Sequence, residues 1–521
     1  MKSNQSCTSN NDKLTLLKAD NAALSEQVDT LKNQLDWFKR QLFGRKSEKQ
    51  IIENPQQINL FSLPQVTPPV PEETTEIKAH QRKSSTQRNG DEVNDSGLRF
   101  DSSVPQKIID VCAPELQGSD AEQYEIIGYK ETNRLAQQPG SYVVLVYRRP
   151  VVRHKKQQTL TTVAAPDNAL EGCYADVSVL AGMMVDKAVY HLPLYRQHQR
   201  LVYAGIQLSR ATLTNWIFKS IELLRPIYEA QRRHILKSQV LGMDEVPIKA
   251  GKKSKGKMNQ AYFWPIYGDS DEIAFTWSKT RGTAHAIEQL TGFSGTLITD
   301  GYQAYTKAVK KLNEEDEKIT HATCWAHLRR YFEKSLPMEP EAAQDALDMI
   351  AKIYLVERQI KSKNLNADEI KQHREKCSEP KVTAFFNWVY VQRQRIDLLP
   401  SNPLSKALYY ASERIPELKV FLANPNVPMD TNHVERALRV IPMGRKNYLF
   451  CWSELGAEQL GILQSLMVTC RMQGVNPYNY LVDVLQRISL HPASEIDVLT
   501  PRVWKDTFTD NLLVSDLAIL G

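Results

Sequence analysis

Two aspartates and a glutamate stand at positions from which they can hold a divalent metal ion together. Asp244 follows the apolar stretch 240–243, and Asp300 follows the apolar stretch 296–299. If both stretches are strands that neighbour each other in one sheet, the two carboxylates emerge at the same edge and converge to metal-bridging distance. Glu435 lies on an expected helix and is placed to supply a third ligand across the sheet.

These ligand types indicate phosphoryl transfer. Carboxylate oxygens select magnesium or manganese over zinc and leave coordination positions for water and phosphate. Two such ions activate the attacking oxygen and stabilise the leaving oxygen in an in-line displacement at phosphorus. Water as the nucleophile nicks a DNA strand, whereas a liberated 3′-hydroxyl joins it to a new strand. The chain holds 60 acidic residues, so the spacing of these three alone does not establish the site.

The stretch CWAHLRR, residues 324–330, follows another expected strand. Cys324 and His327 form half of a zinc site at best, because no second Cys/His pair lies nearby in the sequence. We therefore expect Cys324 to pack under the sheet and His327 to bridge polar groups near the acids. Arg329 and Arg330 are then expected to contact phosphate.

Basic residues also follow Glu435. Helical spacing over residues 432–440 puts Arg436 and Arg439 near one face, where they either clamp DNA beside the metal ions or pair with acids. Lys446, a little further along the chain, is a further expected DNA contact.

Residues 171–235 have the pattern of a helical DNA-binding region. A helix is expected from residue 192, followed by a break around Gly205, an N-cap at Ser209 and a second helix up to about residue 220. One more helix is expected between this second helix and the first strand of the catalytic domain. Two helices joined by a short glycine-containing turn fit a helix-turn-helix, although an ordinary helical hairpin packed on the core has the same pattern. In the first interpretation, the second helix presents these residues to DNA: Arg210, Thr212, Thr214 and Asn215.

The elements that carry the acids follow the order of a ribonuclease-H-like mixed α/β sheet. Five strands are expected, with a helix between the third and fourth: 239–243, 261–267, 273–277, 296–299 and 321–324. This predicts a catalytic domain over residues 236–445, with a helical insertion at about 340–423. A helical C-terminal region is expected over 446–521.

The N-terminal part has a different character. Apolar residues with heptad spacing predict a coiled coil over 12–50, in which Asn21 favours a parallel dimer or a higher oligomer built on it. An amphipathic helix folded on its own domain is the alternative. Residues 51–105 are polar and rich in proline, as in a disordered linker, and 106–170 predict a small module of short strands.

Composition narrows the class of protein. The 66 Lys and Arg residues against 60 Asp and Glu residues give a formal charge of only +6, so overall charge does not establish a nucleic-acid partner. Basic clusters at 148–156 and 249–257 are either phosphate contacts or solvated loops. Seven scattered cysteines, the lack of a signal peptide and the lack of a long apolar run favour a cytoplasmic protein that has no membrane partner.

Motifs along nearly the whole chain resemble the bacterial insertion-sequence transposases typified by insertion sequence 66. The motifs are FGRKSEK at 43–49, HLPLYRQ at 191–197, LSRATLTNW at 208–216, MDE at 243–245, TDGYQAY at 299–305, CWAHLRRYF at 324–332, NHVERALR at 432–439 and NYLFCWSELGAE at 447–458. The resemblance implies a DDE-type enzyme with Asp244, Asp300 and Glu435 as its acidic triad. It also implies action on double-stranded terminal inverted repeats and target DNA, with accessory proteins from the same element.

One departure from the family pattern concerns zinc. Such transposases usually carry a four-cysteine zinc module after the linker, whereas this region of the chain offers only Cys112 and the distant Cys173. We therefore expect a degenerate module without zinc, held together by packing.

Two other functions fit parts of the pattern. A DNA-binding repressor or decayed transposase needs the dimer and the helix-turn-helix but has no need for the acidic triad. A ribonuclease-H-like nuclease without strand joining needs the triad but has no need to pair two DNA ends.

Overall fold

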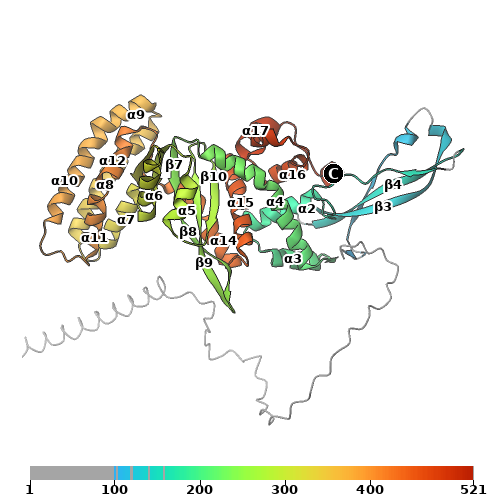
Figure 1. The fold of residues 1–521 in the computed structure, drawn as a ribbon, viewed down its shortest axis with the longest axis horizontal. Coiled ribbons are helices and arrows are strands. Elements are labelled where there is room, and N and C mark those ends of the chain that lie inside the picture. The colour runs from blue at the N-terminus through green and yellow to red at the C-terminus, as the bar shows by residue number, and fades with distance from the viewer. Residues whose placement is uncertain are drawn as a thin grey trace, which may run out of the picture. The chain divides into compact units, whose positions relative to one another are not determined.

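The computed structural model describes residues 99–519 apart from 101, 103, 118–120, 139–140 and 157–158. The coiled coil expected over residues 12–50 and nearly all of the expected linker lie outside the described residues. Figure 1 shows the described chain with its central sheet, the helices on both sides and a separate antiparallel hairpin.

The central sheet is mixed, and its strand order is β10-β9-β7-β11-β12. Strands β7, β11 and β12 are parallel to one another, whereas β9 is antiparallel to both β7 and β10. The order and directions are consistent with the expected ribonuclease-H-like core. The strands are β7 (Val240–Met243), β9 (Lys257–Tyr267), β10 (Ile273–Ser278), β11 (Gly295–Thr299) and β12 (Ile319–Thr323).

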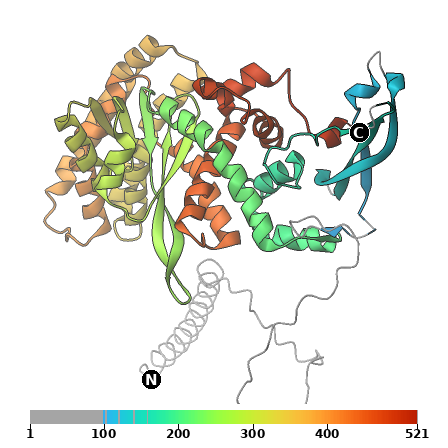
Figure 2. The same cartoon turned by 45° about the vertical axis from the view of Figure 1, so that its right-hand side comes forward.

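A sixth strand, β8 (Val246–Ser254), was not expected from the sequence. It pairs with β9 in a hairpin that extends from the sheet, as Figure 2 shows in lime green. The basic stretch 249–257 therefore belongs to a hairpin and not to a loop. Its lysines are all exposed: Lys249, Lys252, Lys253, Lys255 and Lys257.

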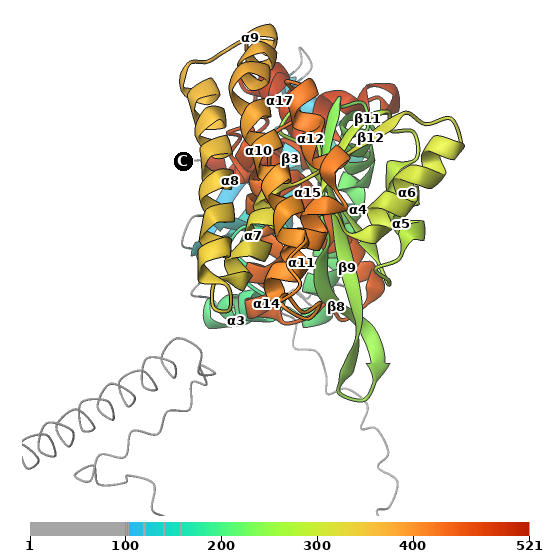
Figure 3. The same ribbon diagram turned by 90° about the vertical axis from the view of Figure 1, so that its left-hand side faces the viewer.

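Both faces of the sheet are buried, because side chains alternate along each strand. Leu241 and Leu297 face a core that α5 (Thr283–Leu290) and α6 (Gln303–Glu314) share, whereas Ile298 faces a second core beneath the helical insertion. Figure 3 shows α5 and α6 on one side of the strands and α10–α12 on the other.

The chain between β12 and α13 (Asn432–Leu438) is helical. Trp325 anchors it: the indole is fully buried, its Nε1 donates a hydrogen bond to the Leu418 carbonyl at 2.8 Å, and it packs against Phe385 and Phe421. The helices are α7 (Trp325–Ser335), α8 (Pro340–Ser362), α9 (Ala367–His373), the π-helical turn η3 (Arg374–Ser378), α10 (Glu379–Arg393), α11 (Pro403–Ser412) and α12 (Ile415–Ala423).

Beyond the insertion, the chain returns to the sheet. α13 (Asn432–Leu438), α14 (Val440–Tyr448) and α15 (Glu454–Met472) pack on β8, β9 and β10. α16 (Pro477–Arg487), η4 (Ala493–Leu499) and α17 (Pro501–Phe508) complete the C-terminal region. None of the described helices is both long enough and apolar enough to cross a membrane.

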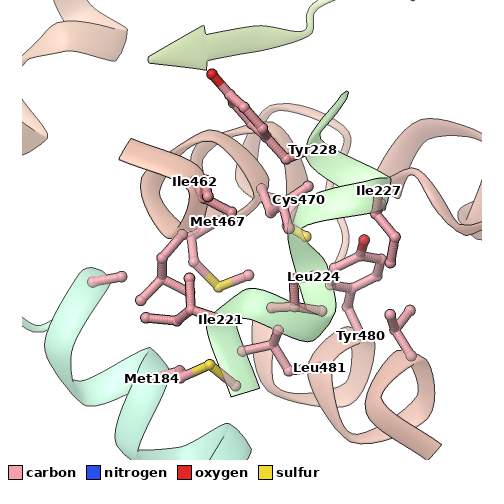
Figure 4. Packing of buried hydrophobic residues seen from close by; sticks show 14 of the residues in the cluster. Met184, Ile221, Leu224, Ile227, Tyr228, Ile462, Met467, Cys470, Tyr480 and Leu481 are labelled. Atoms are coloured by element: carbon pink, nitrogen blue, oxygen red, sulfur yellow. The ribbon is translucent and has the colours of Figure 1, made fainter. Parts of the chain in front are cut away.

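The region expected to be a helix-turn-helix consists of α2 (Val177–Ala188), α3 (Leu194–Tyr203), the short strand β6 (Ile206–Gln207) and α4 (Arg210–Ile235). α4 is one continuous helix, although the sequence indicated two. The two halves form one helix because they share a single buried face. Figure 4 shows that face, where Ile221, Leu224, Ile227 and Tyr228 of α4 meet residues of α2, α15 and α16: Met184, Ile462, Met467, Cys470, Tyr480 and Leu481.

The small β module has longer strands than the sequence indicated. β3 (Tyr124–Gln138) and β4 (Ser141–His154) form an antiparallel hairpin, and the shorter strands β2 (Gln106–Asp110) and β5 (Leu160–Thr162) pair with β4. The remaining elements here are β1 (Arg99–Phe100), which pairs with β6, and the turns η1 (Pro114–Leu116) and η2 (Ala121–Gln123).

Packing holds the hairpin on both of its faces. Val144 and Val146 of β4 join the main core, whereas Leu145 and Tyr147 join a small cluster with Leu517 of α18 (Asp516–Ile519). Of the two cysteines considered for zinc, Cys112 is exposed and Cys173 is half-buried.

Helix α15 approaches the sheet closely at Gly461, which yields a prediction about stability. A Cβ at this position would lie 2.7 Å from the Phe275 carbonyl oxygen of β10. Overpacking of a core costs roughly 1–3 kcal/mol, more than the ~1 kcal/mol that alanine gains over glycine in a helix. We expect Gly461→Ala to lower the thermal unfolding midpoint, measured by circular dichroism.

The control is Gly456→Ala in the first turn of the same helix. There the added Cβ meets only the Ser453 hydroxyl, at 3.1 Å, so the midpoint should change less. A higher midpoint for Gly461→Ala would contradict the close helix-to-sheet packing.

Candidate active site

Asp244 and Asp300 lie at the carboxyl ends of two neighbouring parallel strands. β7 and β11 pair with Gly242 opposite Ile298, so the residues that follow each strand emerge at the same edge. Ligand oxygens of Asp244, Glu245 and Asp300 all lie within 4.8 Å of one another. The structure therefore brings two of the three predicted acids together and adds an acid that the sequence analysis did not select.

Backbone contacts fix the two aspartates. The Asp244 Oδ1 atom accepts a hydrogen bond from the Glu245 backbone N–H at 2.8 Å, and the Asp300 Oδ1 atom accepts one from the Tyr302 backbone N–H, also at 2.8 Å. The Tyr410 hydroxyl of the helical insertion donates to the Asp300 carbonyl at 2.6 Å. The insertion thus holds the turn that carries Asp300.

Glu245 is the least exposed of these acids and has strong partners. Its side chain is 2% exposed; it accepts hydrogen bonds from the Tyr305 hydroxyl and from Arg281 Nε, both at 2.6 Å. The Arg281 guanidinium lies 4.1 Å from the centre of the Tyr302 ring. Alternation along β7 would have placed Asp244 and Glu245 on opposite faces, but the strand ends at Met243 and the rule no longer applies.

The cluster concentrates negative charge in a buried place. Burial, together with the negative charges of Glu245, Asp300 and Glu435, raises the pKa of Asp244 to about 7, although the backbone hydrogen bond from Glu245 lowers it. Burial also raises the pKa of Glu245, although Tyr305 and Arg281 lower it. Crowded carboxylates, with the pKa of Asp244 and Glu245 raised, fit a hard divalent cation, which would remove their mutual repulsion.

Glu435 lies on α13, close to this edge. Gly242 of β7 leaves room for Val434, since a Cβ on Gly242 would lie 2.5 Å from a Val434 methyl group. The Glu435 carboxylate accepts hydrogen bonds from Arg330 on both oxygens, and its Oε1 lies 3.7 Å from His327 Nε2. In this structure the third predicted acid, Glu435, is therefore paired with Arg330 and is not part of the cluster formed by Asp244, Glu245 and Asp300.

The residues around CWAHLRR occupy several different environments. Cys324 is fully buried, and its Sγ accepts a hydrogen bond from the Thr431 backbone N–H at 3.2 Å. Burial and the neighbouring Arg330 charge lower the pKa of His327. Arg329 pairs with Glu333 at 2.8 Å. Both arginines expected to contact phosphate thus have acid partners in this structure.

The other residues predicted to contact DNA lie elsewhere. Arg210 and Asn215 are exposed at the start of α4, whereas Thr212 and Thr214 are half-buried. The Ser209 hydroxyl caps this helix by accepting a hydrogen bond from the Thr212 backbone N–H at 3.0 Å. Three further residues are exposed and form no ion pair with any residue that the structure describes: Arg436, Arg439 and Lys446.

Comparison with protein families gives matches to three models. Residues 172–459 match the transposase IS66 family, which is of the DDE type, and residues 465–501 match the IS66 C-terminal element. Residues 30–91 match a model described as transposase C of IS166 homeodomain. The DDE type implies a metal-dependent enzyme that acts on DNA, and the carboxylate group described above provides suitable ligands.

Proteins from Sinorhizobium fredii are similar over much of the chain. The uncharacterized protein y4qI is 27% identical over 503 residues, which cover 93% of this chain and 90% of that protein. The uncharacterized protein y4hP is 27% identical over 410 residues, covering 73% of this chain and 71% of that protein. The match to the family model spans more than half of the chain, and the matched part includes the carboxylates at the edge of the mixed sheet. The chain therefore belongs to the IS66 family of transposases.

Proposed function

We propose that this transposase cleaves the ends of its element and joins them to target DNA, with Asp244, Asp300 and Glu435 as its catalytic acids. The observation that carries the proposal is the convergence of Asp244 and Asp300 at the ends of two adjacent parallel strands. Half-buried aspartates placed this close together repel each other unless a cation binds between them.

The carboxylates of Asp244, Asp300 and Glu245 determine that the site is suited to binding divalent metal ions. Asp244 and Asp300 offer oxygen ligands from the edge of the sheet, and the ion pair with Arg281 holds the buried Glu245 carboxylate beside them. Magnesium or manganese ions, two in our proposal, would supply Lewis-acid activation of the attacking and leaving oxygens when bound there. The sheet contributes orientation, because both aspartates are fixed by backbone N–H groups.

Glu435 and Arg330 have a shared role in this proposal. The Arg330 guanidinium now neutralises the Glu435 carboxylate beside the aspartates. We propose that Glu435 turns to the cluster when metal and DNA are bound, which frees Arg330 to contact phosphate as the sequence analysis predicts. His327, within 3.7 Å of Glu435, would steady the carboxylate during the exchange.

DNA would be held outside the carboxylate cluster as well. The exposed Arg210 and Asn215 at the start of α4 are suited to a groove contact, and the lysines of the β8–β9 hairpin are suited to the backbone. We further propose that a coiled coil over residues 12–50 pairs two chains, so that both ends of an element are held together, with accessory proteins of the same element.

One prediction from the proposed function concerns catalysis. On a labelled element-end duplex with magnesium, we expect Asp300→Asn and Glu435→Gln to bind DNA but to lose cleavage and joining by more than about 100-fold, beyond the loss typical of second-shell residues. The reaction would be followed on denaturing gels, with any accessory proteins supplied. Matched controls are Asp345→Asn and Glu341→Gln on the exposed side of α8, which should react like the wild type.

The alternatives give different results in the same assay. A repressor or a decayed transposase would bind the duplex while the wild type and all variants stay inert. A nuclease would cut the duplex without producing joined strands. Loss of activity in the control variants would show that charge removal alone disturbs the protein.

A second prediction concerns Glu245 as a positioning residue. Glu245→Gln removes the charge that holds Arg281 and lies beside the aspartates, so we expect a roughly 10–100-fold loss of activity at limiting magnesium. A titration should show a higher half-saturating magnesium concentration, with partial recovery at high magnesium. Glu288→Gln, whose side chain is 71% exposed, is the control. An unchanged magnesium dependence in Glu245→Gln would argue against this role.

A further inference from the structure

A basic hollow lies beside α13 and is separate from the carboxylate cluster. It has a volume of about 570 Å³ and is formed where the α2–α3 loop, the end of β9, α13, α14 and the end of α15 meet. The residues that could bind a ligand there are His191, Tyr267, His433, Arg436, Arg439 and Arg471. We refer to it as the arginine pocket.

The arginines of this pocket differ from the other arginines near the active site. Arg281 and Arg330 each bind a glutamate. Arg436, Arg439 and Arg471 form no ion pair and no side-chain hydrogen bond with any residue between 99 and 519 that the structure describes, and all three are exposed. Three permanent positive charges around one hollow repel each other unless an anion lies between them.

His191 supplies a second and independent observation. It is 9% exposed, and its buried Nδ1 has no hydrogen-bond partner among the described residues. Its backbone is left-handed, with φ at 57°, a conformation that costs energy in a non-glycine residue and recurs at ligand-binding sites. Burial and the Arg471 charge lower its pKa, so at neutral pH the ring is a neutral donor and acceptor. His191 therefore leaves an unpaired polar atom beside a cationic pocket, where an oxygen-rich ligand would provide the missing hydrogen-bond partner.

The chemistry of the pocket selects the ligand. Three guanidinium groups exclude a metal ion, and their planar arrays of N–H donors match the oxygens of phosphate. Neither of the two acids that act on His433 lines the pocket: Asp271 accepts a hydrogen bond from the Tyr267 hydroxyl, and Asp430 accepts one from the Asn432 side chain. The pocket volume of about 570 Å³ is larger than one phosphate group needs, and it suits a short stretch of sugar-phosphate backbone.

We infer that the arginine pocket binds a phosphate of the DNA backbone, and this inference rests on the proposed function as a DNA transposase. Arg436 directly follows Glu435 on α13, so a phosphate held by Arg436 and Arg439 fixes the helix that carries the third proposed acid. Because Arg471 ends α15 and His191 precedes α3, the same phosphate links the catalytic sheet to the helical region at the start of α4.

The test measures DNA binding by the full chain without metal, so no cleavage is required. A fluorescent duplex is titrated at several salt concentrations with the wild type, with Arg439→Gln/Arg471→Gln, and with the charge-matched control Lys361→Gln/Lys363→Gln on the insertion. Each phosphate contact contributes about 0.9 to the slope of log affinity against log salt. We expect the arginine variant to lower the slope by about 0.9 and the control to leave it unchanged.

Hydrogen exchange of residues 189–195 provides a second readout that does not depend on a substitution. DNA should slow exchange in this loop of the wild type and have less effect in the arginine variant. Equal slopes for the arginine variant and the control, or no DNA binding by the wild type, would overturn the inference. So would protection of the loop by inorganic pyrophosphate but not by DNA, which would identify a site for a small free anion.

The outcome is separable from that of the catalytic proposal. If the slope changes but the wild type neither cuts nor joins DNA, the arginine pocket stands and the catalytic assignment fails. If cleavage depends on the acids but the slopes are equal, the catalytic assignment stands and the pocket does not bind DNA.

Discussion

The parallel pairing of β7 with β11 is the constraint on which the rest of the site depends. Two strands that run in the same direction end at the same edge, and this is how Asp244 and Asp300, far apart in the sequence, come within reach of one ion. A parallel pair needs a crossover, and β9, β10 and α5 provide it before β11 begins. Helices cover both faces of the sheet and exclude water from the strands. The carboxylates lie where these buried strands end, at an edge that is partly exposed to solvent.

Crowded acids at such an edge destabilise the fold unless they are compensated. The chain meets this cost at one acid with Arg281 and Tyr305, which bind Glu245, and at another with Arg330, which binds Glu435. Asp244 forms no ion pair with any of the described residues, and burial together with the neighbouring acids raises its pKa to about 7. The negative charges of Glu245 and Glu435 are therefore neutralised within the described part of the chain, whereas that of Asp244 is not. A divalent ion would have its greatest stabilising effect at Asp244.

The sequence predicted those features of the fold and the site that depend on residues close together in the chain. Apolar stretches that end in a carboxylate located both aspartates and the parallel strands, and Ser209 located the start of α4. Features that depend on distant residues were missed. Glu245 joins the cluster because β7 ends one residue before Asp244, and α4 is continuous because its whole length shares one buried face. The surroundings of His191 come from segments almost 300 residues apart, which no local pattern reveals.

The short helix α13 has opposite charges at adjacent positions. Glu435 points to Arg330 and the carboxylate edge, whereas Arg436 lines the arginine pocket. Val434 fixes the helix to the sheet at Gly242, which has no side chain to keep it away. Ala437 and Leu438 are buried with Val434, so α13 is fixed on the sheet at three residues. A phosphate bound by Arg436 and Arg439 would therefore act on the same short helix that carries Glu435. In the function proposed above, DNA bound in the pocket would stabilise the helix that positions the third acid, so substrate binding and completion of the metal site would be coupled.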